Sequence, residues 1–169
     1  KGKRTIMAKN KEEKTNVMRV LEQKKIAYTA HTYPHEEGVA VDGVTVAQSM
    51  GFDPAIVFKT LVARGASKQY YVFDVPVAES LDLKKAAKAV GEKSVEMIHQ
   101  KELLPLTGYV HGGCSPVGMK KLFPTVIHKT AEDLETMIVS AGKIGCQVEL
   151  SPQDLAALVR AQFADITVE

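Results

Sequence analysis

The fold is set by the stretch Val57-Phe58-Lys59-Thr60-Leu61-Val62 together with the stretch Tyr70-Tyr71-Val72-Phe73-Asp74-Val75. Both are rich in β-branched and aromatic residues, and the polar run 64–69 between them is typical of a turn. The two stretches therefore predict an antiparallel β-hairpin around which the rest of the domain is built.

Lys59 places a charge in a strand that would otherwise be apolar. An ammonium group among apolar neighbours loses hydration unless an anion or several acceptors replace the water, so we expect Lys59 to meet a ligand. A structural interpretation is also open. If Arg64 pairs with Gln69 across the turn, Lys59 falls opposite Asp74 and forms a cross-strand ion pair. The two interpretations can hold together.

The composition is that of one globular domain. Of the 169 residues 45% are apolar and 25% charged, which is enough for one well-packed core and too little for two ordinary domains. The net charge of +2 gives little long-range attraction, so a nucleic-acid partner would need a local basic patch. We expect residues 1–10 to be an upstream extension or a vector-derived remnant and residues 11–169 to form the domain.

The sequence predicts a protein without membrane contact. No apolar stretch approaches the roughly 20 residues of a membrane span, and no signal peptide precedes the first predicted helix. A cytoplasmic location is the default expectation. The cysteines, Cys114 and Cys146, are too few for a secreted disulfide framework, so free thiols are expected.

Histidines and Cys114 suggest two further kinds of site. His31 and His35 are four residues apart, but a proline between them argues against a helix that would align them on one metal ion. His111 and Cys114 lack a complementary pair of ligands, so we expect no metal and no cofactor. Cys114 with His111 or His99 would alternatively form a nucleophile and base, although packing is the more frequent role of a lone buried cysteine.

Helical and strand patterns alternate along the chain without a regular βαβ rhythm. Apolar periodicity, caps and breakers predict helices over 11–26, 44–50, 81–90, 100–104 and 152–161, and further strands over 28–33, 95–98, 107–110, 125–128, 137–140 and 147–150. This arrangement favours a single α+β domain around a mixed, curved β-sheet.

A glycine-rich loop follows the predicted strand 107–110. It reads Gly112-Gly113-Cys114-Ser115-Pro116-Val117-Gly118-Met119-Lys120-Lys121. Gly113 and Gly118 have phosphate-loop spacing, but Met119-Lys120 replaces the required Lys-Ser or Lys-Thr, which argues against an NTPase. Backbone N–H groups of such a loop can face a carbonyl or phosphate, as in an oxyanion hole or anion nest. The alternative is a plain turn fixed by Pro116.

A second turn, Ala141-Gly142-Lys143-Ile144-Gly145, follows Ser140 and precedes Gln147. It is either a tight connection between strands or part of a site. Two glycine turns and an inward lysine together favour a pocket for an anionic or ester-bearing ligand, with donors supplied by backbone and ammonium groups.

Five motifs taken in order resemble the YbaK/EbsC family, and most closely its EbsC-like branch, over residues 15–166. They are Val57-Phe58-Lys59-Thr60-Leu61, Leu81-Asp82-Leu83-Lys84-Lys85, Thr107-Gly108-Tyr109, the glycine loop 112–121 and Ser140-Ala141-Gly142-Lys143. The resemblance implies the editing-domain fold related to the insertion domain of prolyl-tRNA synthetase, with a barrel-like sheet flanked by helices.

The resemblance also implies a function. Members are Cys-tRNA(Pro) deacylases, so the expected substrates are Cys-tRNA(Pro) and also Cys-tRNA(Cys), with prolyl-tRNA synthetase as a candidate partner. The implied mechanism is substrate-assisted: the cysteine thiol attacks its own ester carbonyl, releasing tRNA and a cyclic thioester. The pocket then needs only to fold the ester and to stabilise the developing negative oxygen.

The site residues implied by the resemblance are these. Lys59 and Gly113 would be catalytic, Lys59 by holding the terminal adenosine or its phosphate and Gly113 through the loop backbone facing the ester carbonyl. Tyr33 would line the entrance and Thr60 would position the substrate. The full substrate-binding set is Tyr33, Thr60, Gly112, Cys114, Ser115, Pro116, Gly118, Ser140, Gly142 and Gln147.

Two positions depart from the family pattern. Asp42 stands where the best-studied members carry an aromatic residue, and Gln147 stands where they carry an acidic one. A carboxylate can take a proton or hold an ammonium group, whereas an amide can only hydrogen-bond. The alternative hypothesis is therefore a non-catalytic module of the same fold that binds a nucleotide or a tRNA end.

Overall fold

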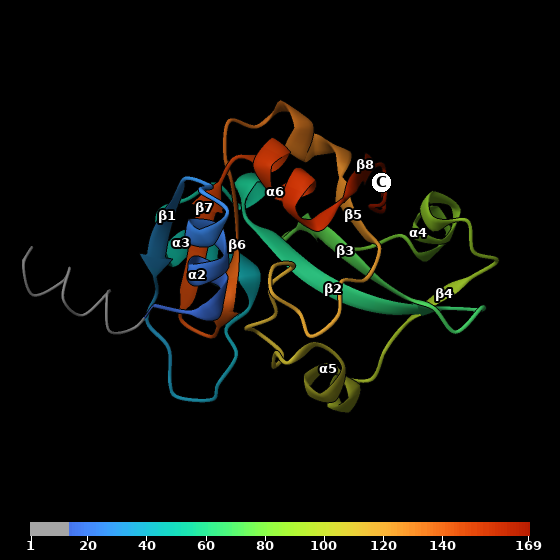
Figure 1. The fold of residues 1–169 in the computed structure, drawn as a ribbon, viewed down its shortest axis with the longest axis horizontal. Coiled ribbons are helices and arrows are strands. Elements are labelled where there is room, and N and C mark those ends of the chain that lie inside the picture. Colours follow the sequence, from blue (N-terminus) through green and yellow to red (C-terminus); the bar gives the residue numbers. More distant parts are fainter. Residues whose placement is uncertain (1–13) are drawn as a thin grey trace, which may run out of the picture.

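Two β-sheets form the framework of the computed structural model, which describes residues 14–169 (Figure 1). The smaller sheet is antiparallel with the order β1-β7-β6, and the larger is mixed with the order β4-β2-β3-β5-β8. The strands are β1 (Tyr28–Thr32), β2 (Phe58–Gly65), β3 (Tyr70–Pro76), β4 (Val95–Met97), β5 (Thr125–His128), β6 (Met137–Lys143), β7 (Cys146–Leu150) and β8 (Gln162–Ala164).

Helices flank both sheets. They are α2 (Asn16–Gln23), α3 (Gly43–Ser49), α4 (Leu83–Val90), α5 (Gln100–Thr107) and α6 (Pro152–Val159), with 3₁₀ turns η1 (Pro54–Ile56) and η2 (Lys129–Asp133). The expected extension 1–10 and the first residues of the helix expected over 11–26 lie outside the described residues. Within residues 14–169, no helix is both long and apolar enough to cross a membrane.

Side-chain caps explain several helix starts. Thr15 accepts from the Met18 N–H, and the Asp82 carboxylate accepts from the N–H groups of Lys84 and Lys85. These bonds satisfy amide groups that a helix N-terminus otherwise leaves without partners.

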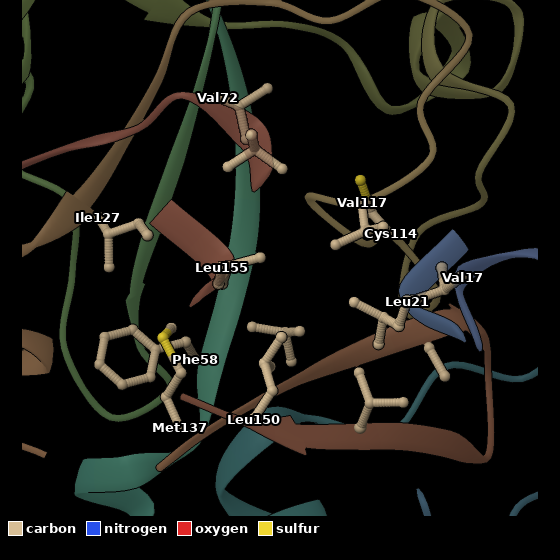
Figure 2. Packing of buried hydrophobic residues seen from close by; sticks show 14 of the residues in the cluster. Val17, Leu21, Phe58, Val72, Cys114, Val117, Ile127, Met137, Leu150 and Leu155 are labelled. Carbon is tan, nitrogen blue, oxygen red and sulfur yellow. The ribbon is translucent and has the colours of Figure 1, made fainter. Parts of the chain in front are cut away.

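The two sheets meet where the chain enters β2. Val57 forms a parallel bridge with Ile138 of β6, and the β-structure does not close into a barrel within the described residues. The expected class, a single α+β domain with a mixed sheet, is confirmed. The largest hydrophobic cluster lies between the sheets, where Phe58 and Ile127 pack with Leu155 of α6 (Figure 2). Full burial of one such side chain contributes about 1.5–3 kcal/mol.

The hairpin is present, but its register differs from the expected one by one residue. Arg64 pairs with Tyr70 instead of Gln69, so Thr60 lies opposite Asp74 and Lys59 lies opposite Val75. The turn holds one more residue than expected, because the Gly65 N–H bonds to the Gln69 carbonyl and Lys68 adopts a φ of 78°. The expected Lys59–Asp74 ion pair is therefore wrong.

The segment after β4 also differs from expectation. We expected a helical turn to end before Pro105 and an extended strand over 107–110, but α5 continues through Pro105 to Thr107. Pro105 removes one intrahelical bond, and the Gly108 N–H bonds the Leu104 carbonyl in the left-handed C-cap. The chain after Gly108 is a loop and not the expected strand. Strand β8, in a different part of the chain, was not predicted from the sequence.

Candidate functional site

A cleft of about 340 Å³ lies between β2, the start of α3, the glycine loop and the β6–β7 pair. Seven residues expected in the site line it, namely Tyr33, Lys59, Thr60, Gly112, Cys114, Ser140 and Gln147. Nine further residues complete its wall: Val41, Asp42, Gly43, Val46, Phe58, Leu61, Val77, Leu103 and His111. The sequence-based site residues thus come from five separated segments of the chain.

The Lys59 ammonium group is partly buried in this cleft and makes no side-chain hydrogen bond or ion pair with any of residues 14–169. Burial lowers the pKa of the Lys59 ammonium group, and the negative charge of Glu79 opposes that shift. A cation without a protein partner at the wall of a cleft is a site for an anion or for several acceptors of a ligand.

Thr60 follows Lys59, and a buried carboxyl group fixes its side chain. Its hydroxyl group donates a hydrogen bond of 2.6 Å to Oδ1 of Asp74, whose exposed fraction is 0%. Burial raises the pKa of Asp74 to about 7, although the Thr60 bond opposes the shift. Oδ2 of Asp74 is buried and has no partner among the described residues.

Cys114 lines the cleft but is a poor nucleophile there. Burial, followed by the charge of Asp74, raises the pKa of the Cys114 thiol to about 12. A thiol so rarely ionised at neutral pH has little nucleophilic strength. No hydrogen bond joins Cys114 to His111 or His99 in the described part of the chain, so the geometry gives no support to a cysteine–histidine pair.

Ser140 and Gln147 face each other in the register of β6 and β7. The Ser140 hydroxyl oxygen accepts from the Gly142 N–H at 3.1 Å, which leaves its proton available to the cleft. Gln147 is 8% exposed, and its Oε1 is buried without a hydrogen-bond partner among residues 14–169. Such a group is costly unless a ligand supplies the missing donor.

The backbone N–H groups of Gly112 and Gly113 in the glycine loop differ in whether they are available to a ligand. The Gly113 N–H donates to the Val110 carbonyl at 3.0 Å, and Gly113 does not line the cleft. The Gly112 N–H has no hydrogen-bond acceptor among the described residues, and Gly112 does line the cleft. Gly112 is thus the better placed amide of the two for a developing negative oxygen.

Four other expected residues shape the loop from outside the cleft. The buried Ser115 accepts from the Val117 N–H, and Pro116 lies between these two residues. Gly118 and Gly142 have φ values of 77° and 99°, and a Cβ on either would lie about 3 Å from Tyr109. The structure therefore gives them a packing role behind the site.

His31 does not line the cleft. Its Nε2 lies 2.8 Å from Oε1 of Glu149, and its ring packs against Phe52. His35 packs near Gly145, and its Nδ1 lies 3.4 Å from the Tyr33 carbonyl oxygen.

Apolar wall residues were missed by sequence reasoning, including Phe58, Leu61 and Leu103. Their signals are those of ordinary core residues. Asp42 was noted only as a departure from a pattern. In the structure its carboxylate caps α3 by accepting from the Thr45 N–H at 3.2 Å, and hydrogen bonds from Thr45 lower the Asp42 pKa.

Taken together, these groups define a binding cleft in which the Lys59 ammonium group, the Gly112 amide and several acceptors surround an apolar wall. The side chains that line it lack an activated protein nucleophile, because Cys114 is protonated and Ser140 has no base hydrogen-bonded to it within residues 14–169. Such a cleft can bind an anionic ligand and polarise a carbonyl group.

Residues 38–158 match the family described as the aminoacyl-tRNA editing domain. This span includes the hairpin, the glycine loop and the β6–β7 pair that enclose most of the cleft. The chain belongs to this family.

A relative from Enterococcus faecalis carries the provisional name Cys-tRNA(Pro)/Cys-tRNA(Cys) deacylase EbsC. It is 46% identical over 164 residues, covering 96% of this chain and 99% of the relative. A solved structure described as a proposed trans-editing enzyme for prolyl-tRNA synthetase is 26% identical, with a TM-score of 0.78 over 90% of this chain and 95% of the other. A hypothetical protein shares the fold at 20% identity, with a TM-score of 0.80 over 90% of this chain and 99% of its own.

Proposed function

We propose that this protein removes cysteine wrongly attached to tRNA(Pro), and also acts on Cys-tRNA(Cys), by cleaving the aminoacyl ester in trans. The observation that carries the proposal is the Lys59 ammonium group, which lines the cleft without a hydrogen-bond or ion-pair partner among residues 14–169. The 3′ end of a charged tRNA supplies both an anion for this group and an ester for the neighbouring amide. The likeness to the Enterococcus faecalis relative supports the choice of amino acid and tRNA.

The reaction is substrate-assisted. The thiol sulfur of the bound cysteine attacks its own ester carbonyl, so a carbon–sulfur bond forms and the bond to the ribose 3′-oxygen breaks. The thiol proton ends on that 3′-oxygen, and the cyclic thioester later hydrolyses. This route requires no protein nucleophile, in agreement with the raised pKa of Cys114.

Six cleft residues have a role in this scheme. Lys59 holds the terminal adenosine or its phosphate, and the Gly112 N–H faces the developing negative oxygen. Thr60 and Gln147 present acceptors to donor groups of the ligand. Tyr33 and Ser140 also line the cleft, where they would contact the bound substrate.

Time courses with Cys-tRNA(Pro), Cys-tRNA(Cys) and Ala-tRNA(Pro) test the proposal. We expect both cysteine esters to be lost and the alanine ester, which has no thiol, to persist. The Lys59→Ala variant should lose about 10- to 100-fold in rate, because a charged hydrogen bond to the ligand contributes about 1.5–3 kcal/mol. Lys84→Ala on α4 is the matched control, since Lys84 is exposed and does not line the cleft.

Two results would contradict this function. If Lys59→Ala deacylates as fast as wild type while both retain the native circular dichroism spectrum, the site is misplaced. If the protein binds charged tRNA but releases no amino acid from any of the three substrates, the non-catalytic module is the correct hypothesis.

The partner and the location follow from the substrate. The net charge of +2 gives the protein little steering field toward tRNA, which favours recruitment by a tRNA-binding partner such as prolyl-tRNA synthetase. A pull-down with and without tRNA(Pro) checks this association. A tRNA substrate also places the reaction where translation occurs, in keeping with the expected cytoplasmic location.

A further inference from the structure

Asp74 is a fully buried carboxyl group directly behind the cleft. It has one hydrogen-bond partner, the Thr60 hydroxyl group at 2.6 Å, while its second oxygen has none among the described residues. A buried carboxyl group with an unsatisfied oxygen reduces the stability of a fold. Thr60 is the only residue that connects this group to the wall of the cleft through a hydrogen bond in the part of the chain described.

The direction of the Thr60–Asp74 bond determines what Thr60 offers to a ligand. A hydroxyl group has one proton and two lone pairs. When Asp74 is ionised it can only accept, so the Thr60 proton points away from the cleft and the lone pairs remain for the ligand. When Asp74 is protonated its own O–H can donate to Thr60, and the Thr60 proton is then free to turn toward the cleft.

We propose that Asp74 is a positioning residue whose protonation state decides whether Thr60 meets the substrate as an acceptor or as a donor. The inference rests on the proposed function, because the ligand group that Thr60 then accepts from is a donor at the charged tRNA end. Two groups there have this chemistry, the α-ammonium group of the amino acid and the 2′-hydroxyl group of the terminal ribose.

The surroundings of Asp74 allow this carboxyl group to titrate alone near neutral pH. Its cross-strand neighbours are Thr60 on β2 and Ile127 on β5, and neither carries a charge. Cys114 in the glycine loop is the titratable group that interacts with it, and its pKa of about 12 keeps it neutral. Because the pKa of Asp74 is raised to about 7, ionisation occurs in the physiological range.

The sign follows from these states. Above pH 7 the ionised Asp74 fixes Thr60 as an acceptor, and a ligand donor binds well. As the pH falls through about 7, Thr60 becomes able to present its proton to that donor, and binding weakens. One hydrogen bond changes affinity by about tenfold.

The test measures binding of a stable probe, an adenosine derivative that carries cysteine through a 3′-amide. For each protein we take the ratio of the affinity at pH 8 to the affinity at pH 6. We expect this ratio to be about tenfold larger for wild type than for Asp74→Asn or Thr60→Val. Ratios to the variants cancel the titration of the probe itself. The double variant should bind no more weakly than Thr60→Val alone, since both changes interrupt one connection.

Two further probes identify the donor. One lacks the amino group and the other lacks the 2′-hydroxyl group. The pH-dependent factor should disappear for the probe that lacks the group bound by Thr60. If both probes retain the factor, the inference is overturned.

Failure of each proposal has its own signature. If wild type leaves Cys-tRNA(Pro) intact, the proposed function is wrong. If wild type is active and both single variants keep its pH dependence of binding, only the role of Asp74 is wrong. Circular dichroism establishes that each variant is folded, and if Asp74→Asn does not fold, Thr60→Val decides alone, because Thr60 is partly exposed and retains a similar volume as valine.

Discussion

Gly113 lies against the backbone of Lys143, so that a Cβ on Gly113 would stand 2.9 Å from the Lys143 Cα and 3.0 Å from the Ile144 nitrogen. The glycine loop and the β6–β7 turn therefore approach each other more closely than any other residue at position 113 permits. This contact sets one wall of the cleft, because Gly112 and Ser140 on either side of it line the cavity.

The Gly113→Ala variant should separate these two turns. We expect a loss of about 1–3 kcal/mol in unfolding free energy and a fall in deacylation rate, since backbone atoms cannot yield as a flexible side chain can. Chemical denaturation and the deacylation assay measure the two effects. Gly51→Ala is the control: Gly51 has a φ of 77° but nothing within 4 Å of a Cβ, so it tests backbone strain alone. Equal effects of both variants on the rate would contradict the steric explanation.

Tyr109 anchors the other end of the glycine loop. Its hydroxyl group donates to the Val117 carbonyl, and the residue is 9% exposed. Tyr109→Phe leaves that buried carbonyl without a donor and should lower the unfolding free energy by about 1–2 kcal/mol. Tyr28→Phe is the matched control, because the Tyr28 hydroxyl donates to Glu22 at an exposed position. A larger effect at Tyr28 would argue against the anchoring role.

Glu149 should make stability depend on acid pH. Hydrogen bonds from Thr136 and then His31 lower the pKa of Glu149 below its ordinary value of 4.5. A carboxyl group with a depressed folded-state pKa contributes stability above the unfolded value and loses it as the pH falls through the folded value. Glu149→Gln should therefore be less stable than wild type at pH 7 by about 1 kcal/mol, and the difference should shrink below about pH 4.

Denaturation midpoints at several pH values check this dependence on Glu149. Glu36→Gln, a change of an exposed carboxylate in the loop after β1, serves as the control for the loss of one surface negative charge. A constant difference between wild type and Glu149→Gln from pH 7 to pH 3 would contradict the assignment.

Cys114 should resist alkylation in the folded protein. With a thiol pKa of about 12, its reactive thiolate is scarce at pH 8, so iodoacetamide should modify it at least about 100-fold more slowly than a free thiol. Mass spectrometry of protein labelled before and after denaturation measures the rate. Rapid labelling of native Cys114 would show that the thiolate is accessible and would revive a direct role for the protein thiol.

Local patterns predicted most elements of this fold. Strand propensity located β2 and β3, a run of strong helix formers located α4, and the sequence around Ser151 located the start of α6 through its cap. These signals act over a few residues, so they are readable without knowledge of the remaining chain.

Register and the state of single polar atoms could not be predicted in this way. The hairpin turn is held by remote residues, since Glu92 bonds the Ser67 N–H and Ser94 accepts from the Ala66 N–H. Because the turn is one residue longer than expected, Asp74 lies opposite Thr60 and not opposite Lys59. The hydrogen bond from the Gly113 N–H to the Val110 carbonyl, which makes this amide unavailable to a ligand, likewise depends on how the loop folds.

The sequence by itself determined that a cation interrupts an apolar strand, that two glycine turns accompany it, and where most of the helices and strands lie. Only the tertiary structure decided that the Lys59 ammonium group has no hydrogen-bond or ion-pair partner among residues 14–169 and that Asp74 is buried behind Thr60. It also decided that Gln147, which lines the same cleft, has a buried oxygen without a hydrogen bond among these residues. The physical reason is the distance along the chain over which each kind of interaction acts. Propensities and caps depend on neighbours along the chain, whereas burial and hydrogen-bond satisfaction depend on segments that meet only in the folded protein.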